Sequence, residues 1–150
     1  MIQRKQTVFL LLAVMATLAC AFLQTGLLEA STMGADVKLY NYCTLSADHS
    51  RSFVSLPLFV LLLISAVLGI MAVFDYKHRP RQARLCSAII GIYLAWYVGY
   101  VAIGCLLYSD YRLIPSWPAG LPLFAMIMTW LARKGIISDE RLVRAADRIR

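Results

Sequence analysis

The sequence Tyr-Lys-His-Arg-Pro-Arg-Gln-Ala-Arg, at positions 76–84, separates two apolar runs at residues 53–74 and 85–108. Each run is long enough to cross a membrane as a helix, because about 20 residues at ~1.5 Å rise span the roughly 30 Å of hydrocarbon. A short connection that carries this much Lys and Arg stays on the cytoplasmic side of the membrane. The stretch therefore predicts two membrane-spanning helices that are joined on the cytoplasmic side.

The composition places the whole chain in the membrane class. Of its 150 residues, 61% are hydrophobic and only 15% are charged, and the mean hydropathy is +0.70. A soluble domain carries more charge than this, and the length leaves room for about four spans and little beyond them. The net charge is +7, and the basic residues lie at the ends of the apolar runs. Orientation in the membrane and anionic headgroups account for that charge, so we expect no nucleic-acid partner.

We predict a single all-α integral membrane domain over residues 1–150. The predicted spans cover residues 7–28, 53–74, 85–108 and 117–133, with an outer loop at 29–52, a cytoplasmic loop at 75–84 and a cytoplasmic tail at 134–150. The first apolar run also fits a signal peptide. We favour an uncleaved span, because the run continues past Cys20. Within the outer loop, a loose alternation at 36–44 allows a short hairpin, although we favour a plain connection.

Positive charge fixes the predicted orientation. The basic residues that fall inside are Arg4, Lys5, Lys77, Arg79, Arg81, Arg84, Arg133, Lys134, Arg141, Arg144, Arg148 and Arg150, whereas only Lys38, Arg51 and Arg112 fall outside. Both termini are therefore predicted to be cytoplasmic. In the tail, Ser138 suits a helix N-cap, and Leu142, Ala145, Ala146 and Ile149 fall on one helical face. This pattern predicts a short C-terminal cytoplasmic amphipathic helix.

Four short motifs carry a resemblance to a known family. They are MIQR at 1–4, LPLF at 56–59, a YKxR…RLC pattern at 76–86 and DExLVRxADRxR at 139–150. Together they resemble a bacterial domain-of-unknown-function family of small four-span inner-membrane proteins. The resemblance covers nearly the whole chain. It implies the fold and a bacterial inner-membrane location, but it implies no catalytic residue, because the family has no assigned activity.

The third predicted span carries two distinct faces. Ser87, Gly91, Ala95, Gly99 and Ala102 form a small face, and Tyr93, Trp96, Tyr97 and Tyr100 form an aromatic face. The small face lets a neighbouring helix approach closely. The aromatic face is either a groove for a lipid or small molecule, or a set of rings that pack among the helices and hydrogen-bond across them. We favour packing.

The remaining reactive residues point to no catalytic centre. His49 and His78 fall on opposite sides of the membrane in the predicted topology, so they cannot share a metal. The four cysteines show no C-x-x-C spacing. Cys43 and Cys105 both belong to the outer side, where an oxidising compartment would allow a disulfide between them. We therefore expect no enzyme activity, no cofactor and no metal, and at most this one bridge.

These features predict a small non-catalytic accessory or scaffold subunit of a larger bacterial inner-membrane complex. The alternative is a lipid- or small-molecule-handling protein that uses the aromatic face of the third span. Predicted partners are anionic lipids and an unidentified membrane protein. The candidate contact residues on the cytoplasmic side are Lys77, Arg79, Arg81, Arg84, Arg141, Arg144 and Arg148. The tail helix either lies at the membrane interface or docks a partner.

Overall fold

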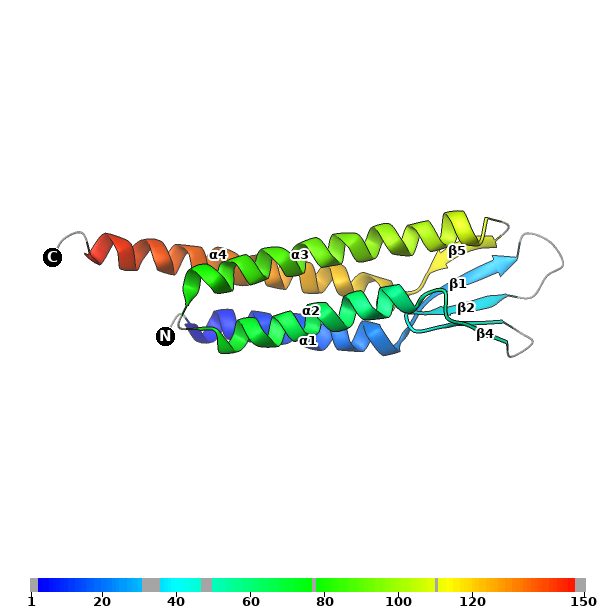
Figure 1. The fold of residues 1–150 in the computed structure, drawn as a ribbon, viewed down its shortest axis with the longest axis horizontal. Coiled ribbons are helices and arrows are strands. Elements are labelled where there is room, and N and C mark those ends of the chain that lie inside the picture. The colour runs from blue at the N-terminus through cyan, green and yellow to red at the C-terminus, as the bar shows by residue number, and fades with distance from the viewer. Residues whose placement is uncertain (1–2, 31–35, 47–49, 77, 110, 148–150) are drawn as a thin grey trace.

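The described residues form four long helices packed side by side and a small sheet at one end (Figure 1). The computed structural model describes residues 3–30, 36–46, 50–76, 78–109 and 111–147. The long helices are α1 (Gln3–Phe22), α2 (Leu56–Phe74), α3 (Arg79–Ala102) and α4 (Leu121–Asp147). α1 and α3 each pack against both α2 and α4. All four are long and apolar enough to cross a membrane, which confirms the predicted number of apolar helices.

Two short helical segments lie at the sheet end. A π-helical segment, Ile103–Leu107, continues α3, and a 3₁₀ turn, Trp117–Gly120, precedes α4. α3 starts earlier than the predicted span, since Arg79 to Arg84 form its first turns instead of a loop. Pro80 is compatible with that start because the first helical turn has no use for its missing N–H. The connection between α2 and α3 therefore runs only from Asp75 to His78.

The sheet corrects the all-α prediction. It has the order β4-β3-β2-β1-β5, and its neighbouring strands are antiparallel. The strands are β1 (Gln24–Ala30), β2 (Val37–Tyr40), β3 (Thr44–Leu45), β4 (Arg51–Ser52) and β5 (Tyr111–Pro115). The β2–β3 pairing is the hairpin that the alternation at 36–44 allowed, so the preference for a plain loop was wrong.

The first helix is shorter than predicted because its apolar run ends in strand β1. α1 ends at Phe22, and residues 24–28 of the predicted span belong to β1. At Gly26 a Cβ would lie 2.6 Å from Tyr100 Oη and 3.3 Å from the carbonyl oxygen of Ile114. The close packing of the strand against α3 and β5 therefore depends on glycine at this position. Apolar composition alone does not distinguish such a buried strand from the end of a helix.

The predicted separate tail helix is also corrected. α4 continues without a break from Leu121 to Asp147, so Ser138 lies inside a helix instead of capping one. Ile136 is fully buried with Leu10 of α1, and the side chain of Gln6 lies against Gly135. These contacts hold the helix together through Gly135, where the sequence alone suggested that the helix ends.

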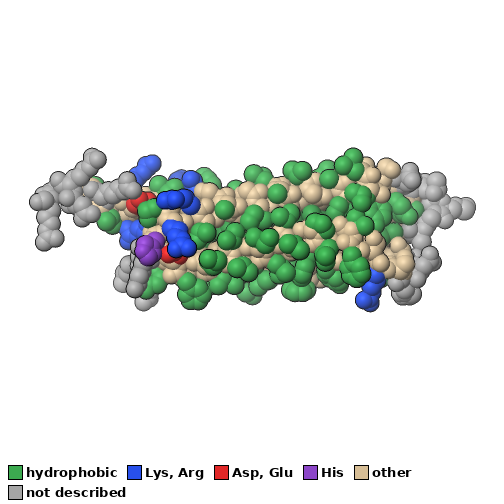
Figure 2. Space-filling view, viewed as in Figure 1, with side chains coloured by type: hydrophobic (Ala, Val, Ile, Leu, Met, Phe, Trp, Pro, Cys, Tyr) green, Lys and Arg blue, Asp and Glu red, His purple; other side chains and the backbone are tan. Residues whose placement is uncertain are grey.

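Charged side chains gather at the end of the molecule opposite the sheet (Figure 2). We call this the basic end and define it by Lys5, Arg79, Arg81, Arg84, Arg133 and Lys134. α1 begins there, and α4 ends there (Figure 1). Exposed hydrophobic side chains cover most of the visible length between the basic end and the sheet end. This distribution is typical of helices that contact lipid.

Candidate functional site

The aromatic face of α3 points into the protein. Tyr93, Trp96 and Tyr100 are buried, and Tyr97 is partly buried. The rings of Trp96 and Tyr100 stack with centroids 5.1 Å apart, and Tyr97 meets Trp96 edge to face at 5.0 Å. The rings of Trp96, Tyr97 and Tyr100 therefore contact one another in an aromatic row on the inward-facing side of α3.

A buried asparagine from the sheet end anchors this row. Asn41 is fully buried, and its Oδ1 accepts a hydrogen bond from Trp96 Nε1 at 3.1 Å. Its Nδ2 donates to the carbonyl oxygen of Cys20 at 2.6 Å, near the end of α1. One side chain thus joins the chain segment after β2 to α1 and α3. Because both the oxygen and the nitrogen of this buried amide have partners, the side chain fixes how these elements pack.

The tyrosine hydroxyls of α3 make similar bonds. Tyr93 Oη shares a 2.6 Å hydrogen bond with Thr17 Oγ1 of α1. Tyr100 Oη donates to the carbonyl oxygen of Thr25 at 2.9 Å, and Tyr97 Oη donates to that of Ala119 at 2.8 Å. All four candidate aromatic residues therefore use their polar atoms within the protein. This arrangement favours the packing interpretation of the aromatic face.

The small face of α3 is covered by the rest of the chain along only part of its length. At Gly99 a Cβ would lie 2.9 Å from Leu58 Cδ2, so this part of the face packs against α2. At Gly91 a Cβ would meet no atom within 4 Å, and the neighbouring Ala95 is exposed. The same row of small residues is thus covered by the chain at one part and uncovered at the other.

Two hydrogen-bonded groups connect the helices at the basic end. The Nε2 of Gln6 in α1 donates to Asp139 Oδ2 in α4 at 2.6 Å, and both side chains are buried. Arg79 Nη1 of α3 donates to the carbonyl oxygen of Asp139 at 3.2 Å. Gln82 Nε2 donates to the carbonyl oxygen of Ala72, which joins α3 to α2. The Arg79–Asp139 contact therefore places the start of α3 beside the part of α4 that follows Lys134.

The other candidate basic residues lie at the surface where they are described. Arg81 Nε is 3.4 Å from Asp75 Oδ2, and Arg84 and Arg141 are exposed. Arg133 Nε donates to Ser87 Oγ at 2.8 Å. Arg144 belongs to α4, but its side chain lies outside the described part, and Lys77 and Arg148 lie outside the described residues altogether.

The cysteines do not form the predicted bridge. All four are free thiols in the structure. Cys43 is buried and Cys105 is exposed in the π-helical segment. Within the described ranges, no group of three or more His, Cys, Asp or Glu side chains is placed to hold a metal ion.

Three polar residues that join distant parts of the chain were not among the predicted site residues. The predicted topology places Asn41 in the outer loop and Asp139 in the cytoplasmic tail, and Gln6 immediately precedes the first predicted span. Each is a polar residue that flanks an apolar or aromatic stretch, which is a weak signal. Their partners lie 21 to 133 residues away in the chain, so no local pattern reveals the bonds.

Four helices of membrane-spanning length and composition, closed at one end by a five-stranded sheet, define a small multi-helix protein suited to crossing a membrane. The chain belongs to a family described as a domain of unknown function (DUF4293), whose model matches residues 2–149. This match confirms the resemblance to a domain-of-unknown-function family. None of the curated proteins matches the chain.

Proposed function

We propose that this protein is a small non-catalytic accessory or scaffold subunit of a larger bacterial inner-membrane complex. The uncovered part of the small face of α3 carries this proposal. Gly91 and Ala95 continue the row whose Gly99 already packs against α2. Small residues at this spacing allow the backbone of another membrane helix to approach closely. A helix of a partner protein is the occupant that this surface fits.

The aromatic face supports the same role. Its hydroxyl and indole groups hold α1, α3 and the sheet together. A scaffold subunit benefits from such internal bonding, because a rigid helix group presents its outer face in one geometry. Lipid or small-molecule handling by this face has no comparable support, since three of the four rings are buried.

A substitution on the uncovered face tests the scaffold role. We expect Gly91→Leu to displace the partner helix and to reduce the recovered complex at least tenfold, because a bulky side chain prevents close helix approach. The measurement is the size and composition of the complex after extraction from native membranes in a gentle detergent. Gly120→Leu is the matched control, since a Cβ at Gly120 also meets nothing within 4 Å. A complex that survives Gly91→Leu unchanged, or a protein that is always monomeric and alone, contradicts the proposal.

The proposed orientation places the basic end in the cytoplasm, with anionic headgroups around it, and the sheet on the outer side. The unequal distribution of Lys and Arg supports it. Two exposed serines allow a direct test in a background without the native cysteines. On intact spheroplasts, a membrane-impermeant maleimide should label Ser109→Cys and should leave Ser138→Cys unlabelled until the membrane is opened. The reverse labelling pattern would show that the orientation is inverted.

A further inference from the structure

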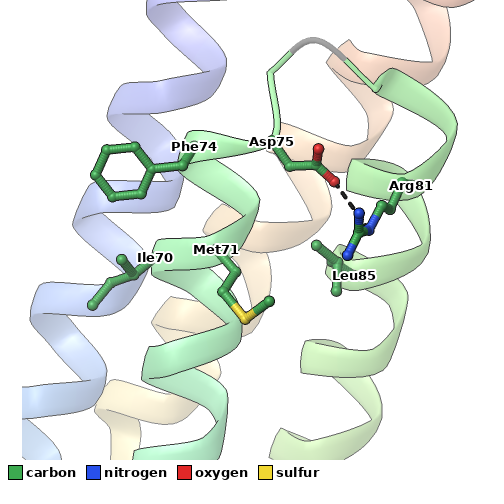
Figure 3. Close-up of a pocket in the computed structure, with 6 residues that line it drawn as sticks. All are labelled: Ile70, Met71, Phe74, Asp75, Arg81 and Leu85. Carbon is green, nitrogen blue, oxygen red and sulfur yellow. Dashed lines mark ion pairs between the residues drawn. The ribbon is translucent and has the colours of Figure 1, made fainter.

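A groove of about 330 Å³ opens between α2 and α3 at the basic end (Figure 3). Its lining consists of Ile70, Met71, Phe74, Asp75, Arg81 and Leu85. Met71 and Leu85 project into the space between the two helices, Ile70 and Phe74 project from the other side of α2, and Asp75 and Arg81 lie close to the turn between α2 and α3. The groove therefore changes from apolar to charged where α2 ends. The same change occurs in a phospholipid, between its acyl chains and its headgroup.

The two charged residues of the groove are paired loosely. Arg81 Nε lies 3.4 Å from Asp75 Oδ2, but this oxygen has no hydrogen-bond partner. The other oxygen, Oδ1, is 3.2 Å from His78 Nδ1. The side chain of Arg81 is 67% exposed, whereas that of Asp75 is only 16% exposed. Arg81 therefore has room to turn outward, which would uncover Asp75 Oδ2, a buried, ion-paired oxygen that accepts no hydrogen bond.

We propose that this groove binds one phospholipid whose headgroup carries both a phosphate and a primary ammonium, as in phosphatidylethanolamine. The ammonium donates to Asp75 Oδ2, and the phosphate accepts from Arg81, which turns toward it. The acyl chains follow the apolar side chains of Met71 and Leu85, which project into the groove. This exchange replaces the ion pair between Asp75 and Arg81 with two ion pairs to the headgroup, and it gives Asp75 Oδ2 the hydrogen-bond donor that it lacks.

The charges of the groove favour this headgroup over two others. A phosphatidylglycerol brings a phosphate without a cation of its own, so its charge is opposed by Asp75. A phosphatidylcholine has a cation, but its trimethylated nitrogen has no N–H to donate to Oδ2. Gly91 does not line the groove, so the proposal does not depend on the scaffold role.

Lipid retention by the full chain tests the proposal. The purified, delipidated protein is exposed to an equal mixture of the ethanolamine, choline and glycerol phospholipids with identical acyl chains, and the retained lipid is quantified by mass spectrometry. We expect about fivefold enrichment of the ethanolamine lipid over the choline lipid, which is the size of a partly exposed ion-pair effect. Equal retention of these two lipids, or preference for the glycerol lipid, overturns the proposal.

Substitutions of Asp75 and Arg81 test whether these two side chains cause the headgroup preference. Asp75→Asn should reduce the ethanolamine-to-choline ratio to about one, and Arg81→Gln should reduce retention of every phospholipid about fivefold. Arg84→Gln is the matched control, because Arg84 is exposed nearby and does not line the groove. Arg81→Gln changes a mostly exposed side chain, so it keeps the test decisive if Asp75→Asn unfolds. An unchanged lipid profile in both folded variants would show that the groove does not select the headgroup.

Discussion

Asn41→Ala is expected to lower the free energy of unfolding by about 3 kcal/mol. The substitution removes the acceptor of Trp96 Nε1 and the donor to the carbonyl oxygen of Cys20, and both groups remain buried inside the protein. A buried polar group that loses its partner costs roughly 1–3 kcal/mol. For a chain of this length the melting temperature, Tm, should fall by about 10 °C. Thermal unfolding in detergent, followed by tryptophan fluorescence, measures the effect.

A double-mutant cycle separates the hydrogen bond from the loss of volume. Trp96→Phe removes the indole N–H that Asn41→Ala leaves without a partner. The double variant should therefore be more stable than the sum of the two single losses predicts, by about 1 kcal/mol. Lys38→Ala is the control on β2, because its side chain is exposed. Additive losses in the cycle, or a Tm of Asn41→Ala equal to that of the control, would refute the anchoring role of Asn41.

The helices were predictable because their signal lies in the composition of continuous segments. About 20 apolar residues in a row have few alternatives to a helix when they lie in a membrane, since a helix satisfies its own backbone hydrogen bonds. The aromatic face of α3 was predictable from helical periodicity, which places Tyr93, Trp96 and Tyr100 on one side of the helix. The preferred interpretation of that face, packing with hydrogen bonds across the helices, agrees with the observed contacts.

The sheet was not predictable from local sequence, because its longest pairing joins distant segments. Strand β1 pairs with β5, and this ladder matches Gly26 with Pro115 and Ala30 with Tyr111. Neither segment alternates clearly between apolar and polar residues. Leu27 and Leu28 instead extend the apolar run of α1, so they read as the end of a helix. The strand becomes favourable only when β2 and β5 supply the backbone partners.

The basic end was predicted in charge but not in structure. An excess of Lys and Arg indicates the cytoplasmic side of a membrane, but it does not show which of these residues lie in helices. Arg79 and Arg81 proved to be in the first turns of α3, and Asp139 proved to be buried. In the sequence Ser-Asp-Glu, an acidic residue also suits the first turn of a separate helix. In the structure Asp139 instead lies within α4, where it accepts a hydrogen bond from Gln6.

Truncation after Lys134 is expected to prevent stable folding. It removes Ile136, which is fully buried, and Asp139, which accepts from Gln6. The loss of a buried isoleucine costs about 2–5 kcal/mol, and a buried amide without its partner costs about 1–3 kcal/mol. Together these losses of about 3–8 kcal/mol equal the whole stability of a domain at the lower end of the usual range of about 5–15 kcal/mol. We expect little monodisperse protein after size-exclusion chromatography in detergent.

Truncation after Glu140 is the matched comparison. It keeps Ile136 and Asp139 but removes Arg141, Arg144 and Arg148, and the first of these is exposed on α4. We expect a folded, inserted protein whose stability changes by about 1 kcal/mol or less, because surface residues contribute little. A truncation after Lys134 that is as stable as the one after Glu140 contradicts the role assigned to Ile136 and Asp139.

The same pair of truncations decides between the two interpretations of the tail. If the exposed end of α4 only lies at the membrane interface, the protein that ends at Glu140 keeps every associated chain. If that end docks a partner through its arginines, the protein stays folded while the partner is lost. The protein that ends at Lys134 cannot answer this question, because its expected loss of the partner follows from unfolding. The contact between Gln6 and Asp139 therefore determines where the tail must be cut for its function to be measured.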